Sequence, residues 1–317
     1  MSTQRQANIS RGQFIRTAGL LTAGMIFAPR DIFAQESPVI TIKNAAAKTP
    51  IKVQALRGNI HVLQGSGGNI GVFNGPEGKV MIDAGIAVSK PRIVKAMNNI
   101  SSKPVKYLVD THWHFDHTDG NEWVHQAGAT IIGHENTRKN LSKDINVKDW
   151  NYTFKAHPKE GLPTIVFKEE HTLKFNGEEI QMKYYPPAHT DSDISVYFPH
   201  ADVLQVADTW WNPYYPFIDH NSGGRLDGMI DACNHNIKIT TDKTIIIPGH
   251  GAVGNRSQVI EFRDMLATVK ENVSKLKSSG RSLSETIAAK PTAKYDKKFG
   301  AYVLDGAFFT RLVYADV

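Results

Sequence analysis

Residues 111–121, THWHFDHTDGN, place three histidines and two aspartates in one short stretch. Burying so many ionisable groups together is costly unless each has a partner, and a metal ion can satisfy several imidazoles and carboxylates at once. His112 and His114 are two residues apart, so in an extended segment both side chains point the same way and can bind one ion. Asp116 and His117 cannot both continue that alternation, so the backbone must turn and can direct this pair toward a second ion. The stretch therefore predicts a site for two metal ions.

Three further candidate ligands occur later in the chain, each expected just past a strand. They are His189 in PPAHTD, Asp208 in LQVADT and His250 in IPGHG. The order HxHxDH, then His, Asp and PGHG resembles the metallo-β-lactamase superfamily, and the resemblance covers nearly all of residues 51–317. It implies a four-layer αββα sandwich, with the metal ions at one edge of its two sheets.

The resemblance also implies how the ligands are shared. It assigns His112, His114 and His189 to one ion, Asp116, His117 and His250 to the other, and Asp208 to a bridge between them. Two zinc ions are expected because imidazole suits zinc, while the two carboxylates leave iron or manganese open. Asp83, in MIDAG, matches a family position where a carboxylate orients the metal ligands. A cap at the end of a strand is the alternative role of Asp83.

Two ions roughly 3.5–4 Å apart can share a water molecule and lower its pKa from about 15.7 toward about 7. The resulting metal-bound hydroxide would be the nucleophile, and one ion would polarise the substrate oxygen. Asp116 would be the catalytic carboxylate, because it can accept a hydrogen bond from the hydroxide and later pass the proton to the leaving group.

Fold and metal site do not fix the substrate. We expect a hydrolase that cleaves a carbonyl ester, lactone, thioester or amide bond of a small molecule. An aspartate at position 208 resembles glyoxalase II and the lactonases, whereas β-lactamases commonly have cysteine or serine there. Hydrolysis of β-lactam antibiotics is the first alternative, because it belongs in the periplasm. The second alternative is a periplasmic metal-binding protein without catalytic activity.

Residues 210–217, WWNPYYPF, are aromatic and interrupted by proline, which predicts a loop near the metals. In this loop Trp210, Trp211 and Tyr214 could form the apolar wall of a substrate pocket. Packing on the edge of the sandwich, without substrate contact, is the alternative. The glycine-rich segment QGSGG at 64–68 is either a plain hairpin turn or a flexible lid.

Residues 1–35 have the pattern of an export signal, in which Arg11 and Arg16 precede an apolar run at 18–28. The run is too short to remain as a membrane anchor. The surrounding SRGQFIR resembles the twin-arginine motif except that Gly12 stands where the second arginine would be. The route could therefore be Sec or twin-arginine-like, and the mature protein is expected in the periplasm or outside the cell.

The remaining chain is predicted to comprise a polar segment, 36–50, and one hydrolase domain, 51–317. Without residues 1–35 it has 33 basic and 30 acidic residues. Positive and negative charges nearly balance, so the composition does not predict a nucleic-acid partner. We expect a small-molecule substrate and no stable membrane insertion. Cys233 is the single cysteine, so no internal disulfide can form. Nothing in the sequence predicts the oligomeric state.

The elements that position these residues follow from the periodicity of apolar side chains. Strands are predicted at 51–56, 59–64, 69–73, 79–83, 105–109, 163–167, 171–175, 178–185, 193–198, 202–206 and 244–247. Helices are predicted at 90–101, 119–126, 224–239 and 258–277. Two sheets flanked by helices account for this mixture.

Overall fold

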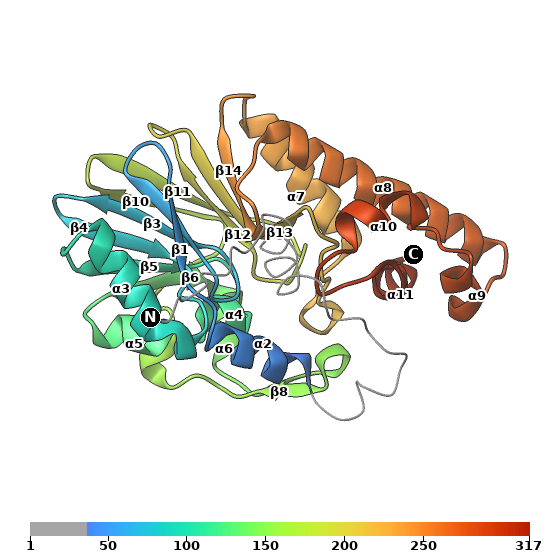
Figure 1. The fold of residues 1–317 in the computed structure, drawn as a ribbon, viewed down its shortest axis with the longest axis horizontal. Coiled ribbons are helices and arrows are strands. Elements are labelled where there is room, and N and C mark those ends of the chain that lie inside the picture. The colour runs from blue at the N-terminus through green and yellow to red at the C-terminus, as the bar shows by residue number, and fades with distance from the viewer. Residues whose placement is uncertain (1–36) are drawn as a thin grey trace, which may run out of the picture.

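The computed structural model describes residues 37–317, so the predicted export signal lies outside the described residues. Two β-sheets pack face to face, and helices cover their outer faces (Figure 1). The predicted αββα architecture is confirmed. Among residues 37–317, no helix is both long and apolar enough to cross a membrane.

The first sheet has seven strands in the order β1-β2-β3-β4-β5-β6-β9. Their bounds are β1 (Lys52–Ala55), β2 (Ile60–Gln64), β3 (Ile70–Gly75), β4 (Gly78–Ile82), β5 (Val105–Asp110), β6 (Thr130–His134) and β9 (Ile165–Phe167). Strands β1 to β4 are antiparallel, whereas β4, β5, β6 and β9 run parallel. Helix α3 (Lys90–Ile100) connects β4 to β5, and α4 (Phe115–Thr118) and α5 (Asn121–Gln126) connect β5 to β6. These crossovers bring the carboxyl ends of the parallel strands to the same edge of the sheet.

The second sheet has five strands in the order β10-β11-β12-β13-β14. They are β10 (Glu170–Phe175), β11 (Glu178–Tyr184), β12 (Ile194–Phe198), β13 (Val203–Asn212) and β14 (Ile245–Gly251). Strands β13 and β14 are parallel, and α7 (Leu226–Ile239) connects them. With α8 (Arg256–Ser278), α7 covers the outer face of this sheet (Figure 1).

Strict alternation along the strands divides the apolar residues between layers. In β4 and β5, Ile82 and Val109 belong to the core between the two sheets. Met81 and Leu108 belong to the core between the first sheet and its helices. A third core lies between the second sheet and the helices α7 and α8, where Phe262 is fully buried.

Several elements lie in segments for which the sequence predicts none. The helices are α2 (Pro38–Ala46), α4, α6 (Glu135–Leu141), α9 (Leu283–Ala288), α10 (Ala293–Phe299) and α11 (Gly306–Asp316). The strands are β6, β7 (Ile145–Val147) and β8 (Tyr152–Phe154), of which β7 and β8 form a separate two-stranded hairpin. Short 3-10 turns are η1 (Ala87–Ser89), η2 (Lys148–Trp150), η3 (Lys159–Gly161) and η4 (His220–Ser222). We call residues 145–154 the β7–β8 arm.

Helix α2 lies in the segment that the sequence describes only as polar. It begins with a cap, because the Ser37 side chain accepts a hydrogen bond from the Val39 backbone and proline follows at the first helical position. The Ser37 hydroxyl also donates to the Trp150 carbonyl oxygen at 2.6 Å, which joins α2 to the arm. The two elements lie side by side in Figure 1.

The composition of residues 210–217 predicts a loop, but the first part of this segment is a strand. Strand β13 continues to Asn212, because its end pairs with β14 at Trp211 and His250. Pairing with β14 extends β13 as far as Asn212, despite the turn that Pro213 predicts, and the loop begins at Pro213.

Candidate metal centre

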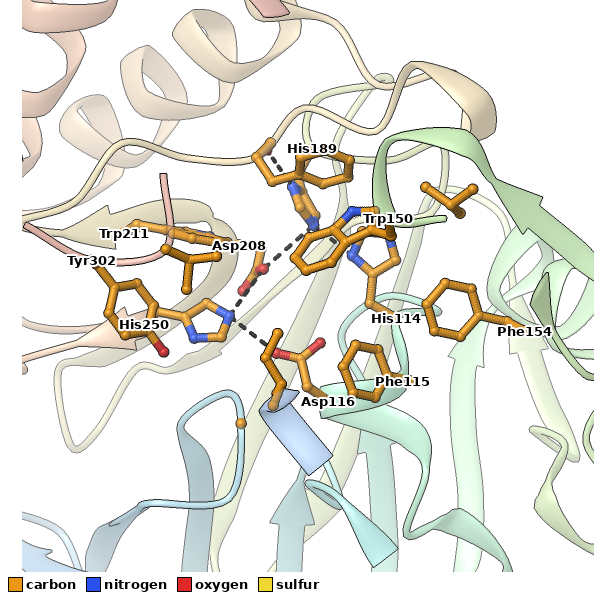
Figure 2. Close-up of a pocket in the computed structure, with 15 residues that line it drawn as sticks. His114, Phe115, Asp116, Trp150, Phe154, His189, Asp208, Trp211, His250 and Tyr302 are labelled. Atoms are coloured by element: carbon orange, nitrogen blue, oxygen red, sulfur yellow. Dashed lines mark hydrogen bonds and ion pairs between the residues drawn. The ribbon is translucent and has the colours of Figure 1, made fainter. Parts of the chain in front are cut away.

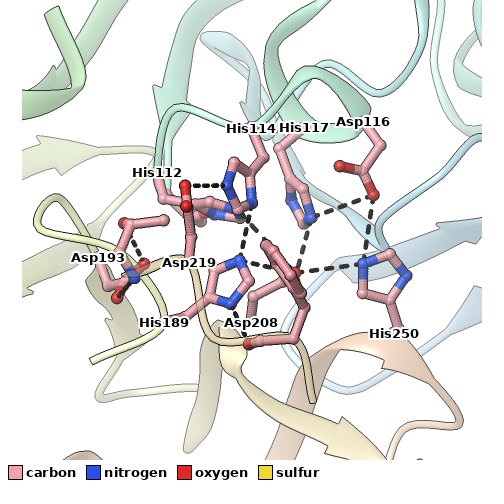
Figure 3. Close-up of polar contacts among 12 residues, drawn as sticks. His112, His114, Asp116, His117, His189, Asp193, Asp208, Asp219 and His250 are labelled. Carbon is pink, nitrogen blue, oxygen red and sulfur yellow. Dashed lines mark hydrogen bonds and ion pairs between the residues drawn. The ribbon is translucent and has the colours of Figure 1, made fainter. Parts of the chain in front are cut away.

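All seven predicted ligands converge at one edge of the sandwich, although they come from both sheets (Figure 3). His112 and His114 follow β5, Asp116 and His117 lie on α4, and His189 lies between β11 and β12. Asp208 and His250 lie inside β13 and β14, not past their ends as expected. A register irregularity in β13 near Ala207, whose φ is 45°, precedes the position of Asp208.

The ligand atoms form two groups, and within each group they lie within 4.8 Å of one another. One group contains His112, His114, His189 and Asp208, and the other contains Asp116, His117 and His250. These are the two sets that the family resemblance implies. The structure therefore brings the predicted residues together, while their role as ligands stays a prediction.

Asp208 contacts both groups. Its Oδ2 lies 3.4 Å from Nε2 of His189 and 3.3 Å from Nε2 of His250. Its Oδ1 lies 3.1 Å from Nε2 of His117. A carboxylate between two clusters of imidazoles can bridge two ions, which is the position predicted for Asp208.

Asp83 contacts His117 directly and is linked to His112 through Thr111, so it is more than the strand-end cap considered as its alternative role. It accepts hydrogen bonds from Nδ1 of His117 at 2.7 Å and from the Thr111 hydroxyl at 2.8 Å. Because that hydroxyl donates to Asp83, it must accept from Nδ1 of His112, 3.1 Å away. Nε2 of both histidines is then free to bind a metal, and both of these buried atoms have no hydrogen-bond partner.

His114 and His189 provide the sharpest test of whether a cation fits. His189 donates from Nδ1 to the Phe217 carbonyl oxygen at 2.7 Å, so its Nε2 carries a lone pair. His114 donates from Nε2 to the Asp219 carboxylate at 3.1 Å, so in the neutral form of this ring Nδ1 carries a lone pair. Nε2 of His189 and Nδ1 of His114 lie only 2.8 Å apart. Two lone pairs at this distance repel each other, and a cation bound by both nitrogens removes the repulsion. The donor set therefore fits a metal ion.

The pKa values of the histidines reflect burial and the carboxylates around each of them. Burial acts to lower the pKa of His117, but the charges of Asp208 and Asp83 outweigh it and raise the pKa well above its usual value. Burial likewise acts to lower the pKa of His250, yet the charge of Asp208 raises it to about 9. Burial lowers the pKa of His189 to about 4, which keeps this ring neutral and able to bind a metal. Carboxylates that stabilise positive charge, next to neutral imidazoles that can act as ligands, are typical of a site for a divalent cation.

Asp219 is a residue that the sequence analysis missed. Burial acts to raise its pKa, but the hydrogen bond from His114 and the charge of that ring lower it to about 2. Asp219 is therefore ionised, and its carboxylate contacts Nε2 of His114, the ring nitrogen on the far side from the candidate metal site. Its sequence context, Ile218-Asp219-His220-Asn221, carries no spacing signal that distinguishes it from a turn aspartate.

The glycine-rich segment 64–68 is a close-packed turn. A Cβ at Gly68 would lie 2.2 Å from Cε1 of His117, and Gly67 has a φ of +88°. The Gly68 backbone N–H donates to the Asp116 carbonyl oxygen at 3.2 Å. Glycine is required here because the backbone passes directly over Asp116 and His117.

A pocket opens above the centre and has a volume of about 530 Å³ including its mouth (Figure 2). His114, Asp116, His189, Asp208 and His250 are the predicted ligands that line it. Its other lining residues are Ile42, Gly67, Phe115, Val147, Trp150, Phe154, Trp211, Phe217, Tyr302 and Val303. The candidate reaction centre therefore lies against an apolar and aromatic wall.

The three aromatic residues predicted for this wall differ in position. Trp211 lines the pocket, with its ring centroid 4.4 Å from that of His250. Trp210 does not line it, because adjacent strand residues face opposite sides and Trp210 is buried in the core toward α7 and α8. Tyr214 lies behind the wall and stacks on the lining residue Tyr302 at 4.5 Å. Tyr302 and Trp150 were missed, since they lie far from the ligand motifs in sequence.

Residues 63–251 match the family model of the metallo-beta-lactamase superfamily. The chain belongs to this superfamily. It is 23% identical over 256 residues to a linear primary-alkylsulfatase of Pseudomonas sp., a match that covers 68% of this chain and 48% of that protein. It is 25% identical over 182 residues to a probable metallo-hydrolase of Methanocaldococcus jannaschii, covering 56% of this chain and 84% of that protein.

Solved structures share the fold of this metallo-β-lactamase superfamily member. A sec-alkylsulfatase of Pseudomonas sp. superposes with a TM-score of 0.65 at 17% identity, covering 85% of this chain and 51% of that chain. A metallo-beta-lactamase from Pontibacter korlensis superposes with a TM-score of 0.55 at 20% identity, covering 68% of this chain and 99% of that chain. The chain spans about half the length of the alkylsulfatases that it matches. The chain thus combines the fold of this superfamily with a buried histidine–aspartate cluster whose atoms could hold metal ions.

Proposed function

We propose that this protein is an exported dinuclear zinc hydrolase that cleaves a carbonyl ester, lactone, thioester or amide bond of a small molecule. The observation that carries the proposal is the pair of ligand groups joined by Asp208 at the floor of an apolar pocket. A mononuclear site would not need Asp116, His117 and His250 beside a complete set of three histidines and a carboxylate.

The proposed chemistry divides between the ions and the chain. A bound pair of divalent ions supplies Lewis acidity, which acidifies a water molecule and polarises the substrate oxygen. His112, His114, His189 and Asp208 would hold one ion, and Asp116, His117 and His250 the other, with Asp208 shared. Burial acts to raise the pKa of Asp116, but the charge of His117 and a hydrogen bond with His250 hold it below its usual value. Asp116 is therefore an anion in the pocket that can orient water and carry a proton to the leaving group.

The wall of the pocket favours an electrically neutral scissile group. No lysine or arginine is among its lining residues within the described chain. Lys43 is adjacent to Ile42 in sequence, but its ammonium pairs with Asp119 at 3.1 Å. An anionic ester would bring a charge that no side chain of this wall compensates, whereas a carboxylic ester, lactone or thioester would not.

Hydrolysis of an alkyl sulfate ester is a second candidate. It is supported by the similarity to a linear primary-alkylsulfatase and by the higher TM-score against a sec-alkylsulfatase than against a β-lactamase. In this case the two ions themselves would have to balance the sulfate charge. The same assay tests the two alternatives considered from the sequence, which are turnover of β-lactams and metal binding without turnover.

A substrate panel on protein purified without added metal tests these candidates. The panel would contain a carboxylic ester, a lactone, a thioester, an alkyl sulfate and a chromogenic cephalosporin, and elemental analysis would count the bound metal. We expect about two zinc ions per chain and the highest kcat/KM on one of the neutral carbonyl substrates. Turnover confined to the alkyl sulfate or to the cephalosporin would replace the proposal, and bound metal without turnover of any substrate would reject it.

We further propose periplasmic or extracellular localisation, a small-molecule substrate and no nucleic-acid partner. Support comes from the basic and apolar pattern of residues 1–35 and from the near-balanced charge of the remaining chain. Mass spectrometry of protein recovered from the periplasm or medium should show an N-terminus near residue 36. Full-length protein confined to the cytoplasm would contradict export.

A further inference from the structure

We propose that α2 and the β7–β8 arm form a subsite for an unbranched apolar chain of the substrate, and that Ile42 and Trp150 set the chain length accepted. The inference rests on the proposed function, because it places the scissile bond at the metal centre. It adds the class of substrate: an amphiphile with a hydrolysable group at one end and an alkyl or acyl chain at the other.

The subsite is built of apolar side chains that face the centre from three separate segments (Figure 2). Ile42 comes from α2, Val147, Trp150 and Phe154 come from the arm, and Tyr302 and Val303 come from the loop before α11. These segments supply none of the predicted metal ligands. Their contribution to the pocket is therefore a surface for substrate.

Aromatic contacts fix the arm over the ligand-bearing segment. Phe154 stacks on Phe115 with a centroid distance of 5.4 Å, next to Asp116. Trp150 meets Phe217 edge to face at 5.1 Å, and Phe217 carries the carbonyl that orients His189. The apolar wall is thus continuous with the backbone that holds the ligands, and a chain attached to the reacting group must pass along it.

Helix α2 is held in place, so Ile42 is a fixed part of the wall. Lys43 pairs with Asp119, the Ser89 hydroxyl donates to the Ala46 carbonyl oxygen at 3.0 Å, and Val39 is fully buried. Ile42 itself is only partly buried and packs with Trp150 and Phe154 in one small apolar cluster. Side chains that are fixed but incompletely covered in this cluster can gain burial from a ligand.

The chemistry of the pocket selects an apolar ligand. The wall beyond the ligands offers no charged side chain, so polarity along the substrate chain would remain uncompensated. Each methylene buried there is worth up to about fourfold in affinity, which predicts a steep dependence on chain length.

The experiment compares p-nitrophenyl esters from acetate to dodecanoate. In the wild type, kcat/KM should rise with chain length by up to about fourfold per methylene, and then level off at the length that fills the pocket. Trp150→Ala should weaken the selectivity for medium chains and move the plateau to longer chains. Ile42→Trp should move it to shorter chains. The matched controls are Lys148→Ala on the arm and Asn44→Ala on α2, which replace exposed side chains.

A binding measurement without turnover separates this inference from the proposed function. Calorimetry with decanoate and acetate should show tighter binding of decanoate in the wild type, and this preference should shrink in Trp150→Ala and persist in the controls. If no substrate of the earlier panel and no p-nitrophenyl ester is hydrolysed but this pattern of binding holds, the proposed reaction is wrong and the chain subsite stands. Equal affinity for the two carboxylates, or variants that behave like their controls, would overturn the subsite even if esters are hydrolysed. Thermal melts and metal content confirm that each variant is folded.

Discussion

Asp116 has one carboxylate oxygen 3.3 Å from Nε2 of His250 and 3.8 Å from Nε2 of His117, and it lines the pocket. It is thus placed both to help hold an ion and to exchange a proton with a reacting group. The two roles respond differently to loss of the charge, since an amide can still donate an oxygen to a metal but cannot carry the proton.

Asp116→Asn is expected to lower kcat by at least about 100-fold, because general acid–base catalysis by one side chain contributes about that much. Much of the bound metal should remain, because the histidines and Asp208 are unchanged. Steady-state kinetics with elemental analysis would measure both effects, with the exposed Asp231→Asn as control. An unchanged rate in Asp116→Asn would remove this residue from the mechanism.

Asp219 acts through His114, so its substitution should appear first in metal affinity. Asp219→Ala should weaken metal binding about 10–100-fold, as is usual when the partner of a ligating histidine is lost, and Asp219→Asn should restore part of it. Competition with a chromogenic chelator measures the affinity, and the exposed Arg225→Ala at the end of the same loop is the control. If both Asp219 variants bind metal like the control, the carboxylate does not orient His114.

At this scale the sequence predicted the seven candidate ligands and Asp83, since their types and order form a recognisable pattern. It could not predict Asp219, because that contact depends on how the loop after β13 folds back toward β5. Trp150 and Tyr302 were missed for the same reason. A pocket wall is assembled from segments whose proximity is a property of the fold.

Among the elements, the long periodic ones were predicted to within a few residues. The helix expected at 258–277 is α8 (Arg256–Ser278), and the strand expected at 105–109 is β5 (Val105–Asp110). Their apolar residues recur at the period of their secondary structure because one face is buried. Helix α2 and the three-residue strands of the arm are too short to show a period, and tertiary contacts stabilise them.

Helix α8 offers a test of the packing at the level of an element. Phe262→Ala should cost about 3–5 kcal/mol of stability, because its side chain is fully buried between α8 and the second sheet. Replacing its exposed neighbour Glu261, which pairs with Lys298, by alanine should lower the free energy of unfolding by at most about 1 kcal/mol. Urea unfolding monitored by circular dichroism gives both values. Similar midpoints for the two variants would place Phe262 outside the core.

At the scale of the whole molecule, the candidate metal centre joins the two sheets, because the predicted ligands come from both. Cations there should stabilise the folded state, since the unfolded chain cannot assemble the site. The carboxylates that raise the pKa values of His117 and His250 are the groups that make the stability of the folded state depend on bound cations.

Chelation should therefore lower the melting temperature. An ion present at 100 times its Kd stabilises by about 2.7 kcal/mol, and 1 kcal/mol corresponds to roughly 2–4 °C for a domain of about this size. We expect a decrease of roughly 5 °C or more, restored by added zinc, in differential scanning calorimetry. The double variant His189→Ala, His250→Ala should show no such response. Equal melting temperatures with and without chelator in the wild type would indicate that the centre does not bind metal in solution.

The hydrogen bond from Ser37 to the Trp150 carbonyl has a practical consequence for anyone who produces or redesigns this protein. Sequence similarity delimits the family at residue 63, but the wall of the pocket begins with a helix that precedes this limit. A recombinant form trimmed to the matched region would keep every candidate ligand and lose part of the surface that faces substrate. An affinity tag fused directly before Ser37 would start next to Trp150, which lines the pocket, so tags are better attached elsewhere.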